Sequence, residues 1–203
     1  MPSTPLLYPT TYFEQEPNPL PSGLMIFVLT AVGSTILLFA YLQLLIDQTE
    51  NLPSGVTQSV YALLGTTVVI TMVVAVISLV VVAAIMHYVI GGSDTAGSFR
   101  AAIAVAGWSY APDLLALPLN YAITRYYLSD MTFDGSDLQE LAAEMEALDG
   151  TLGILDIVLA IGVVSWSVYI LAKGTAGTHD VSVSDTIIPA LIIGIGSLLF
   201  RLI

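Results

Sequence analysis

Residues 60–90 decide the fold class: they read VYALLGTTVVITMVVAVISLVVVAAIMHYVI and contain no Asp, Glu, Lys or Arg. About 20 apolar residues are enough for an α-helix to cross the hydrocarbon core of a bilayer. This run is longer than that, so its helix must tilt or project from the membrane. The stretch therefore predicts a transmembrane helix.

Four further segments have the character of membrane spans. Residues 24–46 carry no charged side chain, and residues 101–123 enclose a single carboxylate, Asp113. Residues 153–172 carry one acidic residue, Asp156, near their start. Residues 186–203 follow two candidate helix-capping residues. We therefore predict an all-α integral membrane bundle of about five transmembrane helices, with residues 24–203 as its single membrane domain.

Two segments outside these spans have recognisable patterns. Between the third and fourth spans, Ser136 and Gln139 form a capping-box pattern, apolar residues recur at helical spacing, and Gly150 supplies a stop. This predicts a short amphipathic acidic helix over residues 136–149. Residues 1–23 are rich in proline and are a candidate interfacial segment.

The composition supports a membrane protein and excludes one class of partner. Hydrophobic residues make up 56% of the chain and charged residues 10%, against roughly 25% charged in soluble domains. Sixteen acidic residues oppose four basic ones, a balance that repels nucleic acid. We expect the lipid bilayer as a partner and no nucleic acid, and we hypothesise a halophilic origin, because salt screens such crowded charges.

The cations give a weak indication of orientation in the cell membrane. With a cytoplasmic N-terminus, Arg100 and Lys173 lie inside, while Arg125 and Arg201 lie outside. This count is a tie under the rule that cytoplasmic loops carry the excess of Lys and Arg. We predict a multi-pass protein with its N-terminus in the cytoplasm and its C-terminus outside.

The third span carries the deepest carboxylate. Asp113 lies 13 residues after Arg100 and 12 before Arg125, which places it near mid-membrane. An ionised carboxylate that faces lipid at this depth costs several kcal/mol. Asp113 must therefore be protonated, paired or turned toward the bundle interior.

The spacing of the third span favours an inward-facing Asp113. Small and polar residues recur there at steps of three and four: Ala102, Ala106, Ser109, Asp113, Ala116 and Asn120. Pro112 and Pro118 each remove a helical donor. We expect unpartnered carbonyls near Trp108 and Leu114 as a result.

The candidate intramembrane polar site comprises Asp113, Asn120, Ser109 and Asp156. Two interpretations stay open: a packed, kinked helix with satisfied polar groups, or a position for a proton, ion or substrate. Asp156 is equally suited to pair with Arg125.

The sequence offers little for catalysis. His87 and His179 are the two histidines, and neither lies in a metal-binding spacing. The glycines at 91, 92 and 97 follow an apolar helix rather than a strand, so they indicate a tight turn and not a phosphate loop. The chain has no cysteine. We predict no enzymatic activity, no cofactor and no metal site.

Several short motifs resemble a family. They are the GG turn at 91–92, GSFR at 97–100, GWSYAP at 107–112, WSVY at 166–169 leading to Gly174, and PTTYF at 9–13. Together they are similar to the Yip family of small polytopic membrane proteins, relatives of the Ypt/Rab-interacting proteins, and to a prokaryotic, haloarchaeal type among them. The candidate family-motif positions are Gly91, Gly92, Ser98, Phe99, Arg100, Pro112, Trp166 and Gly174. Asp113 and the acidic insert from Asp130 depart from the pattern, so neither inherits a family role.

The resemblance implies a five-helix domain with a cytoplasmic N-terminus. Eukaryotic members are linked to vesicle trafficking, Rab-type GTPases and hetero-oligomers, whereas this chain shows no GTPase-binding module. What carries over is a non-enzymatic scaffold, adaptor or membrane organiser that binds a membrane protein or a second copy, through bundle grooves and the loops around Arg100 and Lys173. The alternative is a small proton- or solute-coupled transporter or channel component centred on Asp113. Neither hypothesis identifies a small-molecule ligand.

Overall fold

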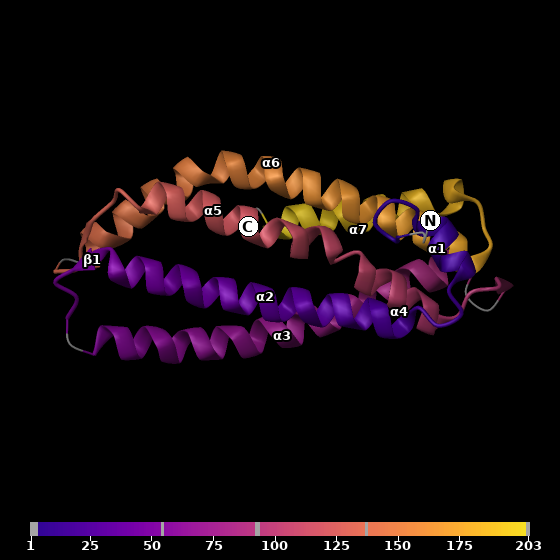
Figure 1. The fold of residues 1–203 in the computed structure, drawn as a ribbon, viewed down its shortest axis with the longest axis horizontal. Coiled ribbons are helices and arrows are strands. Elements are labelled where there is room, and N and C mark those ends of the chain that lie inside the picture. The colour runs from indigo at the N-terminus through magenta and orange to yellow at the C-terminus, as the bar shows by residue number, and fades with distance from the viewer. Residues whose placement is uncertain (1–3, 54, 92–93, 137, 202–203) are drawn as a thin grey trace.

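The computed structural model describes residues 4–53, 55–91, 94–136 and 138–201. The long helices run side by side along one axis (Figure 1). Five helical segments in the described chain are long and apolar enough to cross a membrane. They belong to α2 (Leu20–Asp47), α3 (Val56–Val89), the pair α4 (Phe99–Trp108) and α5 (Ala111–Leu128), α6 (Leu138–His179) and α7 (Val183–Arg201). The predicted all-α bundle with five spans is confirmed.

The third span is two helices rather than one. The helical pattern is interrupted at Ser109 and Tyr110, just before Pro112 in the first turn of α5. Proline has no N–H and fixes its own φ, so it is tolerated at a helix start but not in the middle of a helix. α4 lies at the α1 end of the bundle, and α5 runs toward β1 (Figure 1).

The predicted loop helix is not a separate element. α6 runs without a break from Leu138 to His179, so it joins the acidic segment to the fourth span. Residue 137 of the predicted helix lies outside the described residues. The expected stop at Gly150 is wrong, because a glycine inside a helix costs only about 1 kcal/mol, which a long helix can absorb.

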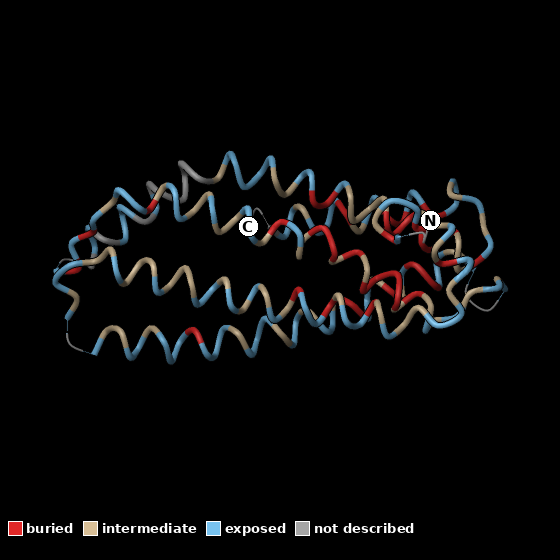
Figure 2. Tube along the Cα trace, viewed as in Figure 1, coloured by how far each residue is buried: buried red, intermediate tan, exposed pale blue. Residues whose placement is uncertain are grey.

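Buried residues gather at one end of the bundle, which we call the packed end (Figure 2). It comprises α1 (Pro9–Gln15), α4, the first turns of α2 and α7, and the last turns of α3 and α6. At the centre, α2 and α4 cross with their backbones in contact. A Cβ at Gly23 would overlap the Ala104 carbonyl, and a Cβ at Gly107 would overlap Gly23. Small residues permit this close approach.

The opposite end, which we call the open end, is held together differently. Two-residue strands, β1 (Thr49–Glu50) and β2 (Phe133–Asp134), pair in parallel and join the loops that follow α2 and α5. The main-chain N–H of Phe133 donates to the Gln48 carbonyl at 2.8 Å. Beside this sheet, Leu128 and Phe133 form a small buried cluster. The helices between this sheet and the packed end alternate between exposed and intermediate residues and have few buried ones (Figure 2).

Candidate functional site

Asp113 lies in the first turn of α5, directly after the break in the third span. The N-terminus of an α-helix carries a partial positive charge from its unbonded N–H groups. That charge favours a carboxylate in the first turn. The break therefore gives Asp113 an electrostatic environment that a residue in the middle of a continuous helix would not have.

The carbonyls at the break are bonded by neighbouring helices. The Ser167 hydroxyl on α6 donates to the Ser109 carbonyl at 2.7 Å. The Thr30 hydroxyl on α2 donates to the Tyr110 carbonyl at 3.3 Å. We expected unpartnered carbonyls near Trp108 and Leu114. The neighbouring helices bond the carbonyl of Ser109, one position after Trp108, and that of Tyr110, four positions before Leu114. Irregular backbone at membrane depth is tolerated where it is bonded in this way.

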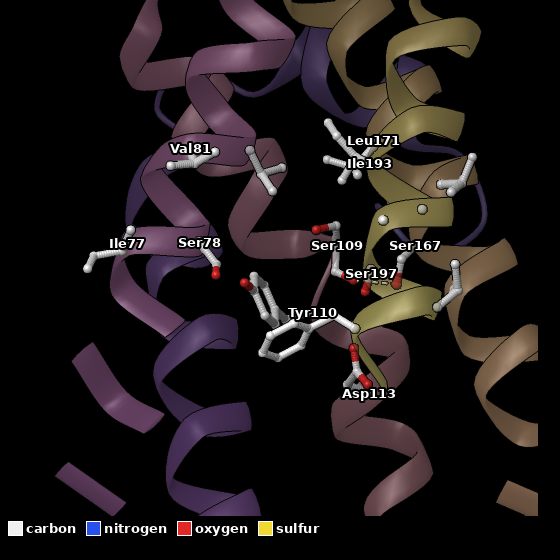
Figure 3. Close-up of a pocket in the computed structure, with 16 residues that line it drawn as sticks. Ile77, Ser78, Val81, Ser109, Tyr110, Asp113, Ser167, Leu171, Ile193 and Ser197 are labelled. Atoms are coloured by element: carbon white, nitrogen blue, oxygen red, sulfur yellow. Dashed lines mark hydrogen bonds between the residues drawn. The ribbon is translucent and has the colours of Figure 1, made fainter. Parts of the chain in front are cut away.

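Three cavities meet at Asp113. The first, of about 370 Å³, lies among α3, α5, α6 and α7. Figure 3 shows that Ser109, Ser167 and Ser197 gather at one side of it, with Tyr110 and Asp113 below. The second, of about 410 Å³, lies among α2, α3 and α5 and is lined mainly by apolar side chains. The carboxylate thus borders space on more than one side.

The third cavity brings together most of the predicted polar site. It has a volume of about 480 Å³ and lies among α2, α5 and α6. Asp113, Asn120 and Asp156 all line it, and so do Tyr41 and Thr124. Ser109, the fourth predicted residue, borders the first cavity instead. The site is therefore a polar column along α5 and the facing part of α6.

A second polar cluster lies at the packed end. His87 Nδ1 and His179 Nε2 are hydrogen-bonded at 2.9 Å, and His179 Nδ1 is bonded to the Thr178 hydroxyl at 2.8 Å. Both rings are buried, and the Phe99 ring lies against His87. Sequence reasoning missed this pair, because 92 residues separate its members and no spacing rule connects them.

Most of the motif positions lie near the histidine pair or on the helices next to it. Gly91 has a φ of 121°, a left-handed conformation that suits glycine in the turn after α3. The Ser98 hydroxyl caps α4 by accepting from the main-chain N–H of Ala101 at 3.2 Å. Arg100 donates to the Asn18 side chain at 3.2 Å, and Gly174 packs under Phe13. Gly92 lies outside the described residues.

Comparison with known families covers almost the whole chain and is not confined to these positions. The model of the Yip1 domain matches residues 5–203 of the chain. The chain belongs to the Yip family. No curated protein and no solved structure gives a significant match. The family, like the five spans, makes this Yip protein a multi-pass membrane protein.

The polar column is a part of this Yip protein whose side chains border cavities. Within the described residues, no group of three or more His, Asp or Glu side chains is arranged to hold a metal ion. The column of Asp113, Asn120 and Asp156 offers oxygen acceptors and an amide beside cavities. Such groups can exchange a proton or bind a small polar solute.

Proposed function

We propose that this Yip protein is a non-enzymatic membrane scaffold or adaptor that binds other membrane proteins or organises the bilayer. Supporting this is the first half of α3, residues 56–75, which has few neighbours within its own bundle. Its exposed face includes Leu63, Val69 and Val73. Within lipid, helices associate chiefly by close packing through small residues. Ala62, Gly65 and Thr66 supply such residues on the exposed side of α3.

Gly65 allows a direct test. No atom outside its own helix lies within 4 Å of where its Cβ would be, so Gly65→Leu adds bulk without disturbing the bundle. We expect Gly65→Leu to lose partners, or a second copy, from crosslinked native membranes while the amount of folded protein is unchanged. Gly162→Leu on α6 is the matched control, because that glycine is equally free of neighbours. Identical partner recovery from wild type and Gly65→Leu would contradict the proposal.

A second candidate function is transport of a proton or solute, and the cavities at Asp113 favour it. Flux through liposomes that contain the purified protein should then be measurable and should fall to background in Asp113→Asn. Ser197→Ala, on the border of the first cavity, serves as the control for altered packing. If the wild type gives no flux, the transport hypothesis fails and the scaffold function stands. If the wild type gives flux and folded Asp113→Asn does not, transport replaces the scaffold function.

The membrane, the type of organism and the orientation of the protein are part of the same proposal. We place it in the cell membrane of a halophilic prokaryote with its N-terminus in the cytoplasm. The net charge of −12 supports the halophilic part, because salt screens repulsion among the acids. A tag after Met1 should be inaccessible to reagents outside intact cells. Labelling of that tag from outside would reverse the orientation.

A further inference from the structure

The N-terminal turn, residues 4–8, lies along the membrane-spanning part of α6. The Trp166 indole N–H donates to the Leu6 carbonyl at 3.0 Å, and the Tyr169 hydroxyl donates to the Leu7 carbonyl at 2.7 Å. The Thr10 hydroxyl in turn donates to the Lys173 carbonyl at 3.1 Å. Two bonds to the turn and a third from the start of α1 thus fix this part of the chain along two turns of α6.

The donors on α6 set the depth of the turn. Lys173 is the single lysine or arginine in α6, and its ammonium lies 5.4 Å from the centre of the Tyr169 ring. With a rise of about 1.5 Å per residue, Tyr169 is about 6 Å and Trp166 about 10 Å nearer the membrane centre than Lys173. Side chains also lean toward the helix N-terminus, which here is the deeper direction. The turn therefore lies below the charged level of α6.

The main chain of the turn is equipped for that depth. Backbone at membrane depth must have its polar groups bonded within the protein. Besides the two bonded carbonyls, the N–H groups of Leu7 and Tyr8 donate to the Thr4 carbonyl at 3.2 and 2.9 Å. Pro5 and Pro9 have no N–H to satisfy, and both are buried against the bundle.

The side chains at the tip of the turn point away from the protein. Leu7 is 61% exposed and Tyr8 is 63% exposed, although each is large and mainly apolar. A tyrosine beside aliphatic residues is typical of the membrane interface, where the ring contacts acyl chains and the hydroxyl contacts water. We therefore take the phase around the turn, at the depth of Tyr169, to be lipid.

We propose that residues 4–8 form a turn that inserts into one leaflet, with Leu7 and Tyr8 in contact with lipid acyl chains. The chain would thus contact the membrane interior at the packed end through this turn as well as through α2. The partner is lipid alone, so the proposal stands or falls separately from the binding of any protein at α3.

The absence of native cysteine makes a depth measurement clean. Leu7→Cys and Tyr8→Cys would carry a nitroxide label in the full chain, reconstituted in phosphatidylcholine vesicles. Collision with oxygen reports lipid, and collision with a water-soluble nickel chelate reports water. Labels at Leu29, exposed on α2, and at Glu14, exposed on α1, give the lipid and water references. We expect both turn labels to match Leu29, with an oxygen-to-nickel ratio several-fold above that at Glu14. Ratios equal to that at Glu14 would overturn the proposal.

A second arm tests the bonds that hold the turn. Adding Trp166→Phe and Tyr169→Phe to the Leu7→Cys chain leaves two carbonyls without donors. The turn should then move to water, and nickel collisions at residue 7 should rise several-fold. Tyr126→Phe, at an exposed tyrosine of α5, is the control, and the Leu29 label reports whether the bundle is intact. Unchanged nickel access in an intact bundle would refute the role of these two donors.

Discussion

The packed end and the open end are built from the same long apolar helices, yet they are held together differently. At the packed end, backbones cross in contact at Gly23 and polar side chains bond across helices. At the open end, a small two-stranded sheet joins the loops, and cavities lie between the helices that lead to it. The difference indicates that the packed end carries most of the stability, while the open end leaves surface and space for other molecules.

The largest expected effect is a loss of folding at the helix crossing. Gly107→Leu would place a side chain on the main chain of Gly23, which cannot yield as a flexible side chain can. Overpacking usually costs about 1–3 kcal/mol, and a backbone clash should reach or exceed the upper value. Thermal unfolding in detergent would measure it. Gly162→Leu meets no neighbour and replaces a glycine inside a helix, so it should not destabilise the protein. Equal losses in both variants would contradict the role assigned to the helix crossing.

The next largest effect is expected at the histidine pair. His87→Phe keeps an aromatic ring in the same buried place but leaves His179 Nε2 without its partner. An unsatisfied buried polar group costs about 1–3 kcal/mol. Tyr88→Phe, in the neighbouring and 70% exposed position, is the control and should be nearly neutral. If the two variants unfold at the same temperature in detergent, the pair does not hold α3 to α6.

A smaller effect is expected at the break between the two halves of the third span. Ser167→Ala removes the hydroxyl that bonds the Ser109 carbonyl, and one such hydrogen bond is worth about 1 kcal/mol. The detergent unfolding temperature should fall accordingly. Ser197→Ala is the matched substitution on α7, at the edge of the same cavity. A loss for Ser197→Ala as large as for Ser167→Ala would assign the effect to the cavity rather than to the bond.

The smallest effect concerns the sheet of the open end. The main-chain N–H of Ser136, followed by the Asn51 amide, holds the pKa of Asp134 below its ordinary value. A lowered pKa stabilises the folded form above the ordinary value of about 3.9, and this contribution is lost as pH falls through the folded pKa. The protection factors of the Phe133 and Gly135 amides, which are corrected for the slower intrinsic exchange at low pH, should therefore fall on acidification in the wild type. Asp134→Asn should remove that pH dependence; an unchanged profile would exclude Asp134 as its source.

The spans could be predicted because their signal is local. Apolar length alone identifies the helix of residues 60–90, whatever it packs against. The spacing of the third span also put Asp113 and Asn120 on one stripe, and the structure places both on the border of one cavity. These inferences needed only the helical period and the cost of a charge in lipid.

The rest depends on contacts between distant residues. Nothing in the sequence around His87 indicates His179, and nothing in residues 4–8 indicates Trp166 or Tyr169. We predicted one kinked helix over residues 101–123 and not a break at Ser109, because Pro112 marks a helix start as readily as a kink. Gly150 failed as a stop because its small local preference is outweighed by the helices on either side of it.

The continuous α6 has a mechanical consequence. At about 1.5 Å per residue its 42 residues form a rod of about 63 Å. One tip carries Glu140, Glu144 and Glu146 beyond the fourth span, and the other ends at His179. A molecule that binds and displaces the acidic tip therefore displaces one end of a long continuous helix. Because the helix is continuous, it offers a direct covalent and hydrogen-bonded path from the acidic tip to the histidine contact.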